Sequence, residues 1–224
     1  DTTAPAVTGT ITATTVEGCG ASDAPAAETT VAGLEGLGLS IADACTADGD
    51  LTVASSDAST GTCPVVVTRT YTVTDDCNNT SVNIEQIINV DDDTAPAVTG
   101  TITATTVEGC DATAAPAAET TVEGLEGLTG DLLIADACTA DGSLTVASSD
   151  ASAGTCPLVI TRTYTVTDAC NNTSVDIVHT ITVEDTTAPA VTGSITATTV
   201  EGCNENDAPA AVTDVAGLEG LTGD

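Results

Sequence analysis

Hydrophobic and polar residues alternate along several short stretches of the chain. In residues 7–14, Val, Gly, Ile and Ala occupy every second position and threonine fills the others. Residues 65–74 show the same alternation, and residues 51–54 and 82–90 add two further stretches. A period of two is typical of a strand with one buried and one exposed face. Each of these stretches therefore predicts a β-strand.

A different pattern follows Thr30. Val31, Leu34 and Leu37 recur at every third position, with glycines between them. Threonine is a favourable residue immediately before a helix, because its hydroxyl accepts a hydrogen bond from the first turn. The glycines disfavour a long helix. We expect one or two helical turns, packed on the edge of the strands.

The whole pattern recurs along the chain. The sequence DTTAPAVTGTITATTVEGC at residues 1–19 returns almost unchanged at 93–110 and 185–203. The longer stretch at residues 41–82 returns at 134–175. Successive copies therefore share both halves of the pattern, and the loops of the two full copies are almost identical.

The period of about 92 residues is the size of a domain rather than of a solenoid unit. The sequence predicts domains at residues 1–92 and 93–184, called repeat one and repeat two below. Residues 185–224 are expected to be the N-terminal part of a truncated third repeat. Near-identical copies in series suit a stalk, which gains length from each copy, better than an enzyme.

The charge excludes several classes of function. Thirty-four acidic residues stand against two arginines, and the net charge is −32. Nucleic acids and anionic membranes are unsuitable partners for such a chain. We also find no apolar run of 18 or more residues that predicts a membrane span, and no signal peptide. We interpret the chain as a mature internal segment of a secreted protein.

The core must be built from small aliphatic side chains. The chain has no Phe, Trp or Met, and its only aromatic residues are Tyr71 and Tyr164. A domain of this size with so few aromatic residues usually needs covalent reinforcement. The nine cysteines are the candidates.

Each full repeat contains four cysteines, for which three pairings are possible. No C-x-x-C pair with a nearby histidine is present, which argues against zinc. In a Greek-key sandwich, the chain enters at one end, here called the N-terminal pole, and two later loops return to it. Cys45 and Cys77 follow predicted strands that end at this pole, whereas Cys19 and Cys63 belong to the opposite end, the far pole.

This argument predicts two disulfides within each full repeat and leaves Cys203 without a partner. Disulfides persist in oxidising compartments outside the cytosol, so they also predict an extracellular protein. The predicted bridges are Cys19–Cys63, Cys45–Cys77, Cys110–Cys156 and Cys138–Cys170.

The sequence TRTYTVTDACNNTSV at residues 161–175, followed by VEDTTAP at 183–189, resembles a known family. It is similar to the HYR-type, immunoglobulin-like repeats of very large surface adhesins, especially those of Bacteroidota, and both full repeats carry the motif. Asn79 and Asn172 stand where the family commonly has glycine, and asparagine also tolerates the left-handed conformation of such a turn.

The resemblance implies an all-β protein of tandem immunoglobulin-like β-sandwich domains, each with a short helical turn and two disulfides. It also implies a bacterial cell-surface or secreted stalk, usually assigned to adhesion. It does not name a ligand, because such repeats often serve as spacers.

Residues suited to catalysis are scarce. His179 is the single histidine and lies in a predicted strand, where repeat one has Gln86. The serine clusters have no base beside them, and the repeats lack the aromatic platform that a glycosidase would use. We therefore expect a protein that is not an enzyme.

Acidic residues gather where the repeats meet, and they are candidates for calcium. Carboxylate oxygens are the ligands that this ion prefers. Asp92 and Asp93 lie at the first junction, and loops at the N-terminal pole of repeat two supply Asp136 and Asp168. The alternative is an acidic, solvated surface. The predicted metal ligands are Asp92, Asp93, Asp136 and Asp168.

Aspartate is followed by serine or threonine only at the start of each repeat. This Asp-Thr pair resembles the O-glycosylation motif of Bacteroidota, which would place glycans on Thr2, Thr94 and Thr186. The alternative is that the segment is simply the extended linker that the following proline demands.

Taken together, these patterns favour a structural repeat of a long extracellular adhesin, stalk or surface filament. Its expected partners are neighbouring repeats of the same chain and other copies in a fibre. The alternative is a module that binds a surface glycan or protein through loops at the N-terminal pole. Such loops should differ between copies, and here they repeat almost verbatim.

Overall fold

A computed structural model describes residues 1–221 of the chain. It separates into two compact units, Asp1–Asp185 and Thr186–Asp224, which are treated separately below. The first unit contains both full repeats. Each of these repeats has its own sheets and its own hydrophobic core.

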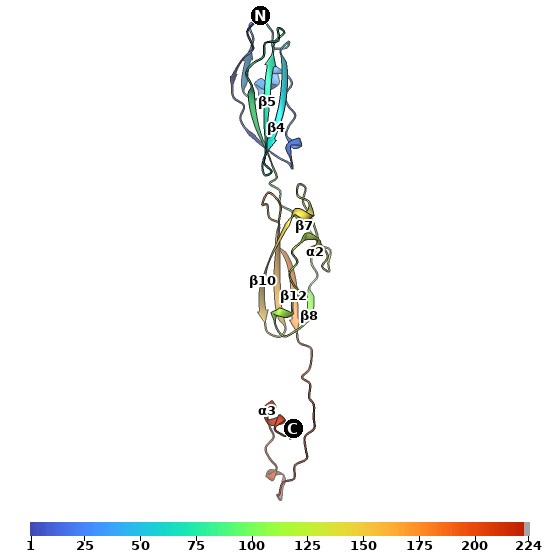
Figure 1. Cartoon of the computed structure of the whole chain (residues 1–224). Helices are drawn as coiled ribbons and strands as arrows, with labels where there is room; N and C mark the ends of the chain where they lie inside the picture. Colours follow the sequence, from blue (N-terminus) through green and yellow to red (C-terminus); the bar gives the residue numbers. More distant parts are fainter. Residues whose placement is uncertain (222–224) are drawn as a thin grey trace. The chain divides into compact units, whose positions relative to one another are not determined.

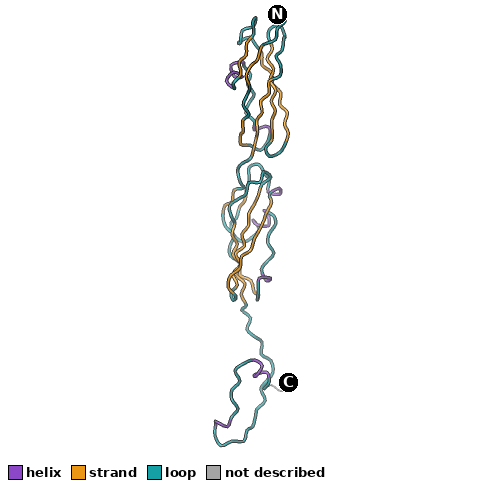
Figure 2. Tube along the Cα trace, turned by 90° about the vertical axis from the view of Figure 1, so that its left-hand side faces the viewer, coloured by secondary structure: helices purple, strands orange, loops and turns teal. Residues whose placement is uncertain are grey.

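Repeat one contains a four-stranded sheet in the order β2-β6-β5-β4 and a two-stranded sheet, β1-β3. Strands β4, β5 and β6 pair antiparallel, whereas β2 pairs parallel with β6 (Figures 1 and 2). The strands are β1 (Ala6–Gly9), β2 (Thr14–Glu17), β3 (Leu39–Ala42), β4 (Thr52–Thr60), β5 (Val65–Thr74) and β6 (Ile84–Asp91).

Repeat two has the same arrangement, with sheets β10-β11-β12-β8 and β7-β9. Its helices, like those of repeat one, are short. The chain is therefore mostly β, which confirms the expected all-β class. The elements of repeat two are β7 (Ala97–Thr99), β8 (Thr105–Glu108), α2 (Val122–Glu126), β9 (Leu133–Ala135), β10 (Thr145–Gly154), β11 (Leu158–Thr167) and β12 (Ile177–Glu184).

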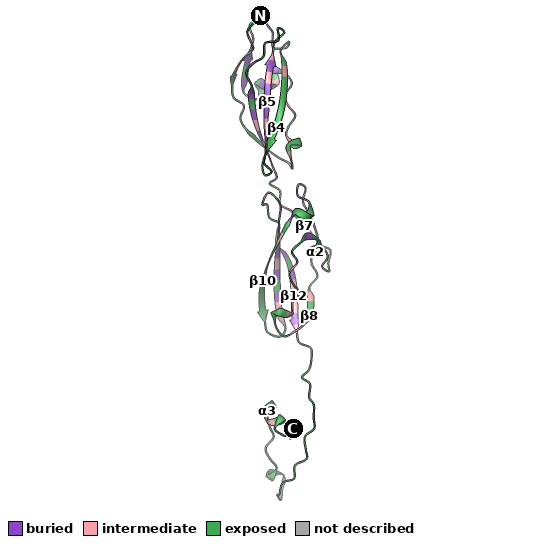
Figure 3. Cartoon of the chain, in the orientation of Figure 1, coloured by how far each residue is buried: buried purple, intermediate pink, exposed green. Residues whose placement is uncertain are grey.

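The alternating pattern predicted β5 well and misjudged the start of the repeat. Strand β5 has the predicted bounds, and its residues alternate in burial, whereas β4 is exposed along most of its length (Figure 3). The predicted strand at residues 7–14 is interrupted: residues 7–9 belong to β1, which pairs with β3, residues 10–13 belong to no strand, and residue 14 begins β2, which pairs with β6. Gly9 ends β1 at a φ of +96°, a conformation that favours glycine. Alternation identifies a buried face but not the sheet that buries it.

The predicted helical turns are confirmed as α1 (Val31–Gly36). The Thr30 hydroxyl accepts a hydrogen bond from the Gly33 amide at 3.1 Å. Val31 and Leu34 are buried in one cluster with residues of both sheets, including Tyr71 of β5. The helix therefore fills the core that its two sheets share.

The interior of repeat one contains two polar side chains, those of Arg69 and Tyr71. Arg69 is buried in β5 and donates to both carboxylate oxygens of Asp57, at 2.8 and 2.9 Å. The Tyr71 hydroxyl accepts from the Glu28 amide at 3.1 Å and donates to Gln86 Oε1 at 3.2 Å. The hydrogen bonds satisfy groups that would otherwise be costly to bury.

The segment from Thr186 contains a short helix. Helix α3 (Val215–Glu219) forms, capped by Asp214, whose Oδ1 accepts from the Gly217 amide at 2.7 Å. In the described part of this segment, residues 186–221, no strand is present. Val215 and Leu218 are 70% and 43% exposed, although their equivalents in α1 are buried. Capping is local, whereas strands need partners from elsewhere in the repeat.

Candidate functional site

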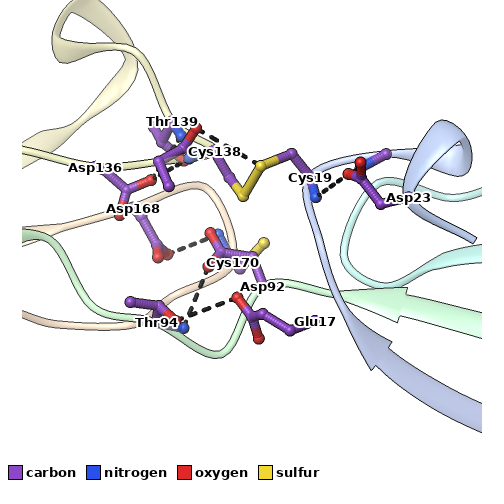
Figure 4. Close-up of a disulfide and its surroundings, with 12 residues drawn as sticks. Glu17, Cys19, Asp23, Asp92, Thr94, Asp136, Cys138, Thr139, Asp168 and Cys170 are labelled. Carbon is purple, nitrogen blue, oxygen red and sulfur yellow. Dashed lines mark hydrogen bonds between the residues drawn. A yellow bond between two sulfur atoms is a disulfide. The ribbon is translucent and has the colours of Figure 1, made fainter.

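The junction between repeats one and two is crossed by two disulfides. Cys19 is bonded to Cys138 (Figure 4) and Cys63 to Cys170, with Cα–Cα distances of 4.8 and 5.4 Å. Both distances are normal for a disulfide. The predicted bridges Cys19–Cys63, Cys45–Cys77, Cys110–Cys156 and Cys138–Cys170 are therefore wrong. The remaining cysteines are free and exposed, namely Cys45, Cys77, Cys110, Cys156 and Cys203.

The error lies in the choice of partner rather than in the grouping of cysteines. Cys19 and Cys63 both belong to the end of repeat one that meets repeat two, and Cys138 and Cys170 both belong to the N-terminal pole of repeat two. Since successive repeats carry equivalent cysteines, a cysteine of the next repeat offers the same chemistry as one in the same repeat. Sequence spacing cannot distinguish the two.

Hydrogen bonds also hold the linker from both sides. Glu17 of β2 accepts from the Asp93 amide and from the Thr94 hydroxyl, each at 3.2 Å. From repeat two, the Asn172 side-chain amide donates to the Asp92 carbonyl at 2.7 Å. The linker is thus fixed to the far pole of repeat one and to the N-terminal pole of repeat two.

Three carboxylates meet at the N-terminal pole of repeat two, and backbone amides orient one oxygen of each. Asp92 Oδ1 accepts from the Thr94 amide at 3.2 Å. Asp136 Oδ1 accepts from the amides of residues 138 and 139, and Asp168 Oδ1 from those of residues 170 and 172. The second oxygen of Asp168 accepts from the Asn172 side chain at 2.8 Å. These hydrogen bonds fix how the carboxylates face one another.

Asp92 accepts fewer hydrogen bonds than either of the other two aspartates. It is 5% exposed, and its Oδ2 is a buried atom without a hydrogen-bond partner. A carboxylate oxygen of Asp92 lies within 4.8 Å of one of Asp168. Burial raises the pKa of Asp92, and the charges of Asp136, Asp168 and Glu17 raise it further. Cys170 Sγ lies in the same group but is bonded to Cys63, so it is not a thiolate ligand.

The fourth predicted ligand, Asp93, does not join this group. Its side chain is exposed, and its pKa is raised by a hydrogen bond to the Glu17 carboxylate and by the charge of Glu17. Glu17 in turn has a lowered pKa because it accepts from the Asp93 amide. In an extended segment, neighbouring side chains point in opposite directions. The structure therefore brings together Asp92, Asp136 and Asp168 and leaves Asp93 outside.

An equivalent group exists in repeat one, although none of its residues is among the four predicted metal ligands. Carboxylate oxygens of Asp1, Asp43 and Asp75 lie within 4.8 Å of one another. Their Oδ1 atoms accept from the same backbone positions as in repeat two. Aligning Pro5 with Pro96 places Asp1 opposite Asp92 and would have revealed the group.

The proposed glycosylation sites Thr2, Thr94 and Thr186 are all exposed. They are not equivalent positions, because the alignment on proline places Thr2 opposite Asp93. The Thr94 hydroxyl, to which a glycan would be attached, donates a hydrogen bond to Glu17. Glycosylation at these residues stays a prediction.

His179 is a core residue of β12. It is 3% exposed, and its Nε2 lies 2.8 Å from the Thr105 hydroxyl. Its Nδ1 is buried without a hydrogen-bond partner. Burial lowers the pKa of His179, and the neighbouring Arg162 lowers it further. The histidine is therefore neutral in the folded protein.

Neither the known protein-family models nor the curated protein sequences match this chain. Among residues 1–221, none of the helices has the length and hydrophobicity that crossing a bilayer requires.

Proposed function

We propose that this chain is a structural segment of an extended extracellular stalk or filament, whose repeats supply length and whose junctions are locked covalently. The observation that carries the proposal is the pair of disulfides across one junction. A single bridge between domains would leave a pivot, whereas two bridges and a linker oppose rotation at three points. The linker from Val90 to Pro96 contains no glycine or serine, the residues of flexible linkers.

The same bonding can continue beyond this junction. Cys110 and Cys156 are equivalent to Cys19 and Cys63, and Cys45 and Cys77 are equivalent to the bonded cysteines of repeat two. All four of these cysteines are exposed. We infer that they pair with the cysteines of the preceding and following repeats, or of other copies in a fibre, so that every junction carries two bridges.

The setting of such a chain is outside the cytosol, where disulfides persist. The resemblance to HYR-type adhesin repeats agrees with a bacterial cell surface or secreted filament. The net charge of −32 keeps long acidic chains soluble and opposes non-specific contacts. A ligand-binding role for the loops at the N-terminal pole is less favoured, because Cys138 and Cys170 in those loops are bonded to repeat one.

The pairing can be tested by digestion at arginine and glutamate without reduction, followed by mass spectrometry. The proposed pattern links peptide 18–28 to 127–162 and peptide 36–69 to 163–184. Bridges within a repeat would instead link peptide 18–28 to 36–69. Detection of that second pair in protein purified from its native source would overturn the locked junction.

A further inference from the structure

We propose that Asp92, Asp136 and Asp168 bind a calcium ion at the N-terminal pole of repeat two. The starting observation is Asp92, which is 5% exposed and has an Oδ2 without a hydrogen-bond partner. Figure 4 shows its carboxylate beside Asp168 and Cys170, at the junction. A buried carboxylate oxygen is normally paired with a donor or a cation.

Asp92 and Asp168 have the oxygen spacing that calcium requires, and Asp136 lies next to them outside that 4.8 Å group. Two oxygens that bind one calcium at 2.3–2.6 Å can be at most about 5.2 Å apart, and those of Asp92 and Asp168 lie within 4.8 Å. The equivalent three carboxylates in repeat one all meet the same limit. Backbone amides occupy Oδ1 of each aspartate, and Oδ2 of Asp168 also accepts from the Asn172 side chain, so Oδ2 of Asp92 is the buried oxygen left without a donor.

No basic side chain is available to neutralise these three charges. The sequence contains only two lysine or arginine residues, Arg69 and Arg162. Each donates to an aspartate elsewhere in its own repeat, Asp57 or Asp150.

Calcium would connect the linker to the loops of repeat two. Asp92 belongs to the linker, whereas Asp136 and Asp168 precede the two cysteines that are bonded to repeat one. An ion held by all three would fix the linker against the loops. This site goes beyond the proposed structural function and is tested separately, since the disulfide pattern does not depend on calcium.

Calorimetric titration of the chelator-treated, oxidised chain with calcium tests the proposal. We expect a dissociation constant of about 10⁻⁴–10⁻³ M, as in extracellular calcium modules. Asp136→Asn should weaken this binding at least tenfold, whereas Asp43→Asn should affect only a second, weaker site in repeat one. Glu123→Gln is the matched control, because it removes one charge from the exposed surface of α2.

Asp92→Asn separates a ligand from a merely structural residue. In chelator, this variant should melt at or above the temperature of the parent, because it removes charge repulsion. In calcium, it should show a much smaller rise in melting temperature than the parent. The absence of saturable calcium binding to the parent would overturn the proposal. So would unchanged binding by Asp92→Asn and Asp136→Asn, or saturable binding of magnesium without calcium.

Discussion

The N-terminal poles of the two full repeats are built from equivalent residues but differ in their surroundings. In repeat two, Asp92 is buried and Cys170 is partly buried and bonded to repeat one. In repeat one, the equivalent Asp1 and Cys77 are exposed. The backbone hydrogen bonds to the three aspartates are the same at the two poles. Burial at this pole is therefore a property of the junction, whereas the geometry of the pole belongs to each repeat.

The interiors of the two repeats differ at one buried polar position. In repeat one, Gln86 accepts a hydrogen bond from Tyr71. In repeat two, His179 contacts Thr105 instead and leaves one ring nitrogen unpartnered. The repeats thus share an architecture that tolerates a change of hydrogen bonding in its core. Substitutions at equivalent positions can separate what each repeat contributes from what the junction adds.

The largest effect is expected from removing one junction disulfide. Cys19→Ser with Cys138→Ser deletes a bridge between residues 119 positions apart. For a loop of this length, the chain-entropy model gives about 4–5 kcal/mol of lost stability. The measurement is denaturant unfolding of the oxidised protein, followed by circular dichroism.

The matched control replaces the equivalent cysteine of the other repeat in each case, Cys45 for Cys138 and Cys110 for Cys19. Cys45→Ser with Cys110→Ser changes the equivalent cysteines, which are free. Stability should stay close to that of the parent. Equal destabilisation by both double variants would contradict the assignment of the bridge to this junction.

A smaller loss of stability, equal in the two repeats, is expected from removing the aspartate that pairs with each buried arginine. Asp150→Ala leaves Arg162 with its hydrogen bond to the Pro116 carbonyl but without its carboxylate partner. A buried charge that loses its partner is costly, but Asp150 is partly exposed, so we expect a loss of about 2–3 kcal/mol. Asp57→Ala should cost the same in repeat one. A clear difference between the two variants in denaturant unfolding would show that the interiors are not equivalent.

The features that could be predicted from the sequence depend on neighbouring residues. The alternation in residues 65–74 predicted β5, and Thr30 predicted the start of α1, because both signals lie within the element itself. The end of β1 at Gly9 and the start of β2 at Thr14 in another sheet could not be predicted, since both depend on partners far along the chain.

The candidate site was predictable in composition but not in detail. Acidic residues at the junction pointed to Asp92, Asp136 and Asp168, which the structure brings together. Asp93 was included because adjacent residues look alike in composition, although their side chains point in opposite directions. The disulfide partners were missed because repeated sequences make a bond within a repeat and a bond between repeats look the same.

The smallest effect concerns His179 and appears in the pH dependence of stability. Its pKa is lowered in the folded state, mainly by burial, whereas in the unfolded chain it is about 6.5. As the pH falls below about 6.5, the unfolded state takes up a proton that the folded state does not. The contribution of His179 to the free energy of unfolding should therefore be fully present above this pH and decrease below it. The decrease is at most about 1.4 kcal/mol per pH unit, and it stops once His179 is protonated in the folded protein as well.

His179→Gln should remove this contribution and make repeat two resemble repeat one. The introduced side chain can accept from the Tyr164 hydroxyl, as Gln86 does from Tyr71, and it eliminates the unpartnered Nδ1. We expect a gain of about 1 kcal/mol at neutral pH and a larger gain at pH about 5.5, which is below the unfolded-state pKa of about 6.5. Comparing unfolding free energies of parent and variant at the two pH values cancels the titration of the shared carboxylates. The reverse variant, Gln86→His, should create the same pH dependence in repeat one. An equal difference in unfolding free energy between parent and His179→Gln at the two pH values would show that His179 is not the source of the pH dependence. In that case, Gln86→His would also leave the pH dependence unchanged.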